Sequence, residues 1–417
     1  MVKALDIEKT VMELVITDDL AEKRQLVKKI FDSASEEGAY PQSIHEFYTA
    51  RGRREFSGFT VPAINLRSMT YDLARAIFRV ALKNDAAAFI FEIARSEIGY
   101  TDQPPIEYAG MVMAAALKEG YSGPVFIQGD HFQIHAAKFK ENPDKEIQSL
   151  QALISEAISS GFYNIDIDSS TLVDVSKPDL KEQQLLNYEV CAKLTKYIRS
   201  LEPKGITISV GGEIGEIGHE NSTPEELRAF MSGFRGNLDK GLSGISKISV
   251  QTGTTHGGVV LPDGSIAQIK LDFETLMTLS ELARGEYGLA GAVQHGASTL
   301  PPEAFHKFVE CEAAEVHLAT QFQNLIYESE HFPAALKQRI YEWLKTNLKG
   351  EAKKEETEEQ FIYKTRKKAL GPFKKEIMIL PQKTRDAIAA ELETEFDFLF
   401  KQLKVEGTKA IVNKYNI

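Results

Sequence analysis

The sequence has little cysteine and no long apolar run. Cys191 and Cys311 are the two cysteines of a 417-residue chain, they lie far apart, and neither has a partner at metal-ligand spacing. A disulfide framework and a CxxC metal knuckle are therefore excluded, which favours a reducing compartment. No stretch approaches the roughly 18 apolar residues of a membrane span, and the N-terminus lacks the basic and apolar regions of a secretory signal. We expect a cytoplasmic protein that does not bind a membrane.

The chain is also poor in positive charge. It has 49 Lys and Arg against 60 Asp and Glu, a formal net charge of -11, which argues against bulk attraction to nucleic acid or an anionic membrane. The exception is residues 331–417, with 18 basic and 13 acidic side chains, which could bind phosphate or form a solvated helical face. Residues 350–360 carry almost no apolar side chains and indicate a mobile linker or an exposed helix.

Short β-branched or aromatic runs alternate with amphipathic helical stretches such as residues 68–84, 105–120 and 144–160, the pattern of βα units around a parallel sheet. Eight runs span about the length of a (β/α)₈ barrel, so we predict a TIM barrel over 59–330, with helical extensions at 1–58 and 331–417. The eight predicted strands are 59–65, 87–93, 125–131, 164–169, 207–215, 247–257, 290–296 and 315–320.

Polar residues gather at the carboxyl ends of these runs, where the loops of an α/β barrel converge and active sites form. They are Asn65, Asp130, His131, Asp168, Ser169, Glu213, His256 and His295. Three imidazoles with one carboxylate suit Zn²⁺, which takes about four N, O or S ligands. A single histidine at a strand end is more often structural, but three in equivalent positions, each near glycine or small residues, predict a metal site.

The motifs at these strand ends resemble those of the class II, metal-dependent aldolases of sugar bisphosphates. The similarity runs from about residue 55 to 330, in order and spacing, with a weaker match from Tyr363 to Leu403. The matching segments are Pro62-Ala63-Ile64-Asn65, Gly129-Asp130-His131, Gly212-Glu213-Ile214-Gly215, Gly253-Thr254-Thr255-His256-Gly257 and His295-Gly296-Ala297-Ser298.

The resemblance implies that His131, His256 and His295 bind Zn²⁺, with Glu213 an alternative or nearby ligand. The metal would polarise the oxygens of dihydroxyacetone phosphate and stabilise its enediolate. Asp130 would act as acid and base at the aldehyde oxygen.

A second base must remove the proton alpha to the carbonyl. Glu220 is the closest counterpart of the family's loop glutamate and Glu216 the runner-up, although a solvated surface glutamate is an equally good interpretation of Glu220. The loop should end at a helix N-cap formed by Ser222 or Thr223 before Pro224.

Phosphate binding in the family uses backbone N–H groups and small hydroxyls after the late strands, an arrangement suited to anions. A Gly-rich turn needed only for backbone geometry is the alternative. The substrate-binding candidates are Asn65, Arg95, Gly257, Gly258, Gly296, Ala297, Ser298, His317 and Thr320.

Several positions depart from the family pattern. His317 and Ala319 replace the asparagine and aspartate expected near the substrate, Ala94 stands where serine is common, and Gly371-Pro372-Phe373 replaces an Asp-Pro-Arg motif. These changes favour altered specificity. The far phosphate would then need another basic residue, and the candidates are Arg95, Arg366, Lys367, Lys368 and Lys374.

The leading hypothesis is a zinc-dependent aldolase that reversibly cleaves a ketose phosphate, first of all fructose 1,6-bisphosphate, into dihydroxyacetone phosphate and an aldehyde. The resemblance further implies a homodimer or larger homo-oligomer and a monovalent cation, Na⁺ or K⁺. Two alternatives stay open. One is a catalytically silent companion subunit of the kind known from tagatose-bisphosphate aldolase, suggested by His317 and Ala319, and the other is a different zinc-dependent barrel lyase or hydrolase.

Overall fold

Eight parallel strands close into a barrel in the computed structural model, which describes residues 5–215, 220–253 and 271–415. Neighbours along the chain pair from β2 to β9, and β2 pairs with β9 to complete the circle, so the predicted (β/α)₈ barrel is confirmed. The barrel strands are β2 (Val61–Asn65), β3 (Ile90–Ala94), β4 (Gly123–Gln133), β5 (Asn164–Asp168), β6 (Ser209–Glu213), β7 (Lys247–Val250), β8 (Ala292–Gln294) and β9 (Glu315–Leu318).

Each barrel strand lies within or overlaps one of the eight predicted runs, and β3 and β4 extend beyond theirs, because strands buried on both faces read as largely apolar segments. The N-terminal extension was predicted to be helical, and besides its helices it contains a strand that was not predicted. Strand β1 (Ala39–Gln42) pairs in parallel with residues 123–126 of β4, outside the barrel circle. Its four residues include Pro41, which suits a sheet edge and conceals any alternating pattern.

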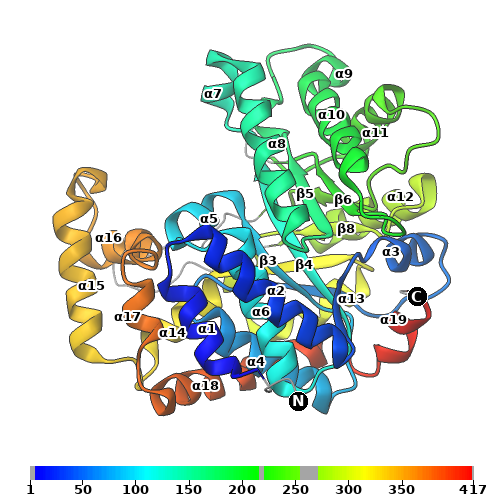
Figure 1. Cartoon of the computed structure of the whole chain (residues 1–417). Helices are drawn as coiled ribbons and strands as arrows, with labels where there is room; N and C mark the ends of the chain where they lie inside the picture. Colours follow the sequence, from blue (N-terminus) through cyan, green and yellow to red (C-terminus); the bar gives the residue numbers. More distant parts are fainter. Residues whose placement is uncertain (1–4, 216–219, 254–270, 416–417) are drawn as a thin grey trace.

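Helices cover the outside of the barrel and follow the predicted stretches closely (Figure 1). The N-cap predicted after Glu220 is confirmed at Thr223, whose hydroxyl accepts a hydrogen bond from the Glu226 amide while the Glu226 carboxylate accepts from Thr223. Between β2 and β9 lie α4 (Thr70–Lys83), α5 (Arg95–Thr101), α6 (Pro105–Glu119), α7 (Ala136–Glu141), α8 (Pro143–Ser159), η1 (Ser170–Leu172), α9 (Leu180–Gln183), α10 (Leu185–Leu201), α11 (Pro224–Asn237), α12 (Phe273–Tyr287), η2 (Ala297–Thr299), η3 (Pro302–Ala304) and α13 (His306–Glu310).

Both terminal segments pack on the barrel, so one continuous core includes residues of every part. The N-terminal helices α1, α2 and α3 lie against it, and the last helix, α19, reaches α3 through a hydrogen bond from Tyr415 to Glu55 and a ring contact between Tyr415 and Phe47 (Figure 1). None of the helices in the described ranges combines the length and the hydropathy that crossing a bilayer demands. The helices that precede β2 or follow β9 are α1 (Ile7–Ile16), α2 (Leu20–Glu36), α3 (His45–Gly52), α14 (Thr320–Glu328), α15 (Ala334–Asn347), η4 (Lys349–Glu351), α16 (Glu358–Thr365), η5 (Arg366–Ala369), α17 (Lys374–Met378), α18 (Gln382–Gln402) and α19 (Lys409–Tyr415).

The charged segment 350–360 is neither a simple linker nor one helix. The segment begins within the last residues of η4, continues without helix or strand, and enters α16 at Glu358. Its residues are largely exposed, as predicted, yet Lys353, Glu355 and Glu356 also line the main cavity at the barrel mouth. Residues 353–356 therefore contribute to one wall of the cavity, a role that composition alone did not indicate.

Candidate active site

A local irregularity in β4 places two neighbouring residues at the same site. The pairing of β4 with β5 shifts register between Gly129 and Phe132, and His131 has a positive φ of 39°. Residue 129 must be glycine, because a Cβ there would lie 2.5 Å from ring atoms of Phe132. Successive side chains of a regular strand point to opposite faces, whereas a bulge changes their direction. As a result, Asp130 and His131 both line the cavity at the barrel mouth.

Two of the three predicted histidine ligands lie together. The ring centroids of His131 and His295 are 4.1 Å apart, and His131 Nδ1 lies 3.3 Å from Glu213 Oε2 and 3.2 Å from Asp168 Oδ2. One ligand atom from each of His131, Glu213 and His295 can be chosen so that all three lie within 4.8 Å of one another. The third predicted ligand, His256, lies outside the described residues.

Negative charge is concentrated beside these imidazoles. Burial and the neighbouring Asp168 raise the pKa of Glu213 to about 7, although His131 opposes the shift. Burial disfavours the charge of His131, but Asp130, Glu213 and Asp168 together raise its pKa well above the usual value. Burial and the charges of His131 and His317 lower the pKa of His295 well below its usual value. Carboxylates and imidazoles in this proportion suit a divalent cation.

The imidazole and carboxylate donors at this site are of the kind that zinc binds. Two imidazoles and a carboxylate converge from three strand ends, and Asp168 lies behind His131 in the manner of the carboxylates that orient metal-binding histidines. These residues could hold Zn²⁺, with His256 as the further predicted ligand.

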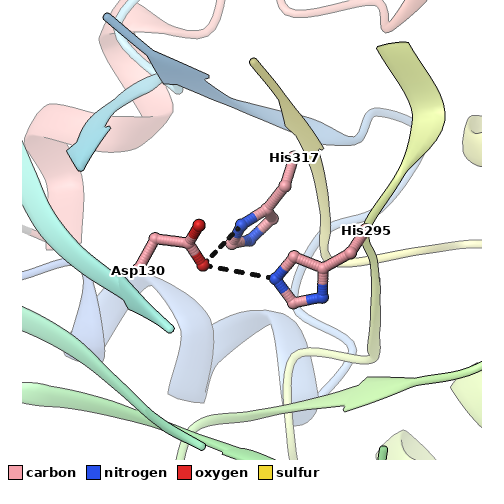
Figure 2. Close-up of side chains that lie close together, drawn as sticks. All are labelled: Asp130, His295 and His317. Carbon is pink, nitrogen blue, oxygen red and sulfur yellow. Dashed lines mark hydrogen bonds and ion pairs between the residues drawn. The ribbon is translucent and has the colours of Figure 1, made fainter. Parts of the chain in front are cut away.

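Asp130 lies deeper and contacts two imidazoles through one oxygen (Figure 2). Its Oδ1 is 3.3 Å from His295 Nε2 and 3.3 Å from His317 Nδ1. Burial opposes its ionisation, but His131, His317 and His295 hold the pKa of Asp130 well below its usual value. Asp130 is thus a carboxylate at the mouth, next to the candidate metal ligands.

Below Asp130 the barrel axis holds a network of buried charges. His317 Nε2 is 2.8 Å from Glu315 Oε2, and Lys247 Nζ donates to the same oxygen at 2.6 Å. Lys247 also lies 3.0 Å from Asp166 Oδ2. Despite burial, Asp166 and Glu315 raise the pKa of Lys247, so this lysine is a cation held between two carboxylates and not a nucleophilic amine.

The cavity at the mouth has a volume of about 1050 Å³ and lies between the strand ends and the C-terminal segment. Arg67, two residues beyond Asn65, lines it and donates from Nε to Glu97 Oε1 at 2.7 Å and from Nη1 to Thr320 Oγ1 at 3.2 Å. Lys367 of η5 also lines it, with Nζ 5.7 Å from the Tyr100 ring centroid. Burial and the nearby Arg67 charge lower the pKa of Lys367, which indicates two cations facing one space.

The structure separates the basic residues that the sequence could not rank. Arg95 lines the cavity, but its guanidinium donates at 2.6 Å to both Glu146 and the Gln133 carbonyl. Arg366 is buried against Asn324, Lys368 pairs with Glu351, and Lys374 pairs with Glu107. Of the five candidates, Arg95 and Lys367 therefore line the cavity, and Arg95 is already engaged.

The other predicted substrate-binding residues divide between the cavity lining and its supports. Asn65, Gly296, Ser298, His317 and Thr320 line the cavity. Asn65 Nδ2 donates to Glu97, and Ser298 Oγ accepts from the Ala319 amide at 2.9 Å.

Two of the predicted residues do not line the cavity. Ala297 is fully buried in η2, and Glu220 is exposed and is not among the described residues that line the cavity. Glu216, Gly257 and Gly258 lie outside the described residues.

Several polar residues at the site were not predicted as functional. Arg67, Glu97 and Glu92 surround Asn65 and His317, while Asp166, Lys247 and Glu315 fill the barrel interior. Their signal in the sequence was alternation: Asp166 and Asp168, and likewise Glu315 and His317, stand two residues apart and so share a face of their strands. Charged residues repeating with that period inside apolar runs mark an interior that is not purely hydrophobic.

A closed α/β barrel whose mouth gathers imidazoles and carboxylates defines a barrel enzyme with a candidate metal centre. The sequence profile described as "Fructose-bisphosphate aldolase class-II" matches residues 53–383. The chain therefore belongs to the class II fructose-bisphosphate aldolase family and is an aldolase, a carbon–carbon lyase.

Solved structures agree in fold. A putative fructose-1,6-bisphosphate aldolase from Coccidioides immitis is 19% identical with a TM-score of 0.51, covering 87% of this chain and 97% of its own. Campylobacter jejuni fructose-bisphosphate aldolase is 18% identical with a TM-score of 0.51, and the match covers 89% of this chain and 97% of that one. A fructuronate-tagaturonate epimerase from Cohnella laeviribosi is 11% identical with a TM-score of 0.56, and the match covers 94% of this chain and 86% of that one. Among curated proteins, none matches the chain by sequence.

Proposed function

We propose that this aldolase uses zinc to cleave a ketose bisphosphate, with fructose 1,6-bisphosphate as the first substrate to test, into dihydroxyacetone phosphate and a phosphorylated aldehyde. The observation that carries the proposal is the convergence of His131, Glu213 and His295 beside Asp130 at the barrel mouth. Bound zinc would supply a Lewis acid that polarises the oxygens at the reacting carbons of the substrate.

The residues around that centre have separable tasks. Asp130, ionised and held through Oδ1, takes the hydroxyl proton during cleavage and returns it to the aldehyde oxygen during condensation. We assign the proton alpha to the carbonyl to Glu220, or to Glu216 as the runner-up, on the family resemblance alone, since Glu220 does not line the cavity. Ser298, Thr320 and the N-terminus of α14 offer hydroxyls and amides to the phosphate of dihydroxyacetone phosphate, together with Gly257 and Gly258.

The cations on one wall of the cavity favour a second anionic group on the substrate. Arg67 and Lys367 both face the cavity and are close enough for the Arg67 charge to lower the pKa of Lys367. An anion between them would relieve that repulsion, and Arg or Lys donors suit phosphate oxygens. We therefore assign the phosphate of the aldehyde half to this wall.

The proposal predicts metal-dependent cleavage by the chain alone. Purified protein treated with a chelator should lose cleavage of fructose 1,6-bisphosphate and regain it when zinc is restored, measured by a coupled assay for dihydroxyacetone phosphate in a panel of phosphorylated ketoses. Zinc binding without cleavage of any ketose in the panel would contradict the aldolase proposal and favour another zinc-dependent lyase. Failure that a second protein rescues would favour the companion-subunit alternative.

The wall of cations predicts a selective effect of Lys367→Met. Losing one charged hydrogen bond to phosphate costs about 1.5–3 kcal/mol, so KM for the phosphorylated aldehyde should rise by roughly 10- to 100-fold in the condensation direction. KM for unphosphorylated glyceraldehyde should not change. Arg228→Met on the exposed face of α11 removes one positive charge elsewhere and serves as the control. Equal losses with both aldehydes would contradict this assignment.

A further inference from the structure

We propose that His317 is a positioning residue that fixes the catalytic carboxylate of Asp130, an inference that rests on the proposed function. The family resemblance leads us to expect asparagine at this place in the sequence. His317 instead brings another imidazole to within 3.3 Å of Asp130 Oδ1, and only 4% of its surface is exposed. The question is what that ring does so deep in the barrel.

The ring of His317 has carboxylates on both sides, with a hydrogen bond at Nε2 and ion-pair distances without hydrogen-bond geometry at Nδ1. Nε2 lies 2.8 Å from Glu315 Oε2, while Nδ1 lies 3.0 Å from Glu92 Oε2 and 3.3 Å from Asp130 Oδ1. Both nitrogens therefore face carboxylate oxygens. His317 also belongs to two groups of side chains that could hold an ion, one with Asp130 and His295 and one with Asp166 and Glu315, so the zinc content of a variant must separate metal binding from a bridge between carboxylates.

The far end of the bridge is itself anchored. Glu315 Oε2 also accepts from Lys247 at 2.6 Å, and Glu315 Oε1 accepts a hydrogen bond from Tyr48. Lys247 donates at 2.6 Å to Gln128 Oε1, and Gln128 Nε2 donates at 3.1 Å to Glu92. Because these groups come from several strands of the barrel, His317 cannot turn without breaking contacts on more than one of them.

The consequence for Asp130 is that one oxygen is fixed and the other is left for chemistry. Figure 2 shows His295 and His317 approaching the same carboxylate oxygen from different strands. Within the described part of the chain, every hydrogen bond and ion pair of the Asp130 side chain uses Oδ1. Two imidazoles thus set the rotation of the carboxylate and leave Oδ2 available to the substrate.

Two reactions separate this role from a structural or metal-binding one. Exchange of the alpha hydrogen of dihydroxyacetone phosphate with deuterated solvent needs the metal and the alpha-proton base, but no aldehyde and hence no proton transfer by Asp130. Cleavage of fructose 1,6-bisphosphate needs the metal, the alpha-proton base and proton transfer by Asp130. A residue that acts through Asp130 should therefore affect cleavage and leave exchange intact.

The experiment compares His317→Asn with the wild type and with His306→Asn, the same substitution at a partly exposed histidine of α13 that does not line the cavity. We expect His317→Asn to lose about 10- to 100-fold in kcat for cleavage, as for residues that orient a reacting group, with exchange and zinc content within about twofold of wild type. Glu92→Gln, which keeps the side-chain size and alters one contact of the ring, should show the same split with a smaller loss. This second variant provides the test if His317→Asn does not fold.

The other outcomes overturn the inference. Loss of zinc from His317→Asn would make His317 a ligand, and a parallel loss of exchange and cleavage would make its role structural. Unchanged cleavage in both variants would show that Asp130 needs no such support. Wild-type protein that neither exchanges nor cleaves would overturn the proposed function, and with it this inference.

Discussion

His131→Ala should abolish zinc binding and lower kcat/KM for cleavage by about 10³-fold, because the Lewis acid accounts for several kcal/mol of transition-state stabilisation. His131 is the imidazole with two carboxylates at 3.2 and 3.3 Å, so its removal leaves Asp168 and Glu213 without their shared partner. Zinc content by elemental analysis and exchange of the dihydroxyacetone phosphate hydrogen should fall together. His306→Ala, at a partly exposed position outside the cavity lining, should change neither. Stoichiometric zinc in His131→Ala would refute the assignment of this ligand.

Asp130→Asn should give a different pattern, with zinc retained and cleavage reduced by about 10²- to 10⁴-fold, the usual contribution of a general acid and base. The amide oxygen can still accept from His295 and His317, so the packing around it should be kept. Hydrogen exchange of dihydroxyacetone phosphate should persist. Asp239→Asn, whose side chain is 70% exposed, is the matched control. Retained cleavage in Asp130→Asn would remove this carboxylate from the mechanism.

The two variants together divide the site into its functions. His131→Ala should stop exchange and cleavage, whereas Asp130→Asn should stop cleavage alone. An identical pattern in both would mean that Asp130 supports the metal and does not handle a proton.

The barrel could be predicted from sequence because its strands are buried on both faces and are separated by amphipathic helices with clear caps. A short, mostly apolar run such as that of β3 is recognisable without any knowledge of its neighbours in space. Strand β1 could not be predicted in the same way, since four residues with a proline carry no period. Its partner, residues 123–126 of β4, lies far away in the sequence, so no local pattern indicates the pairing.

The site was predictable where chemistry and position coincided. Asp130, His131 and His295 are polar residues at strand ends, and parallel strands bring such ends to one edge. Arg67 and Lys367 were harder, because one lies beyond a strand and the other follows more than 40 residues after the last strand. Their proximity depends on how the C-terminal segment folds back over the mouth, which no local pattern contains.

The directions of the Asp130 and His131 side chains both depend on the bulge in β4. In an unbroken strand two successive residues cannot both face the barrel mouth, so their joint presence requires the backbone irregularity between Gly129 and Phe132. Either side chain can be replaced one at a time, but an inserted or deleted residue in this tetrapeptide would turn one of them away from the mouth. A design that places this pair of residues in another barrel would have to include the bulge as well as the two side chains.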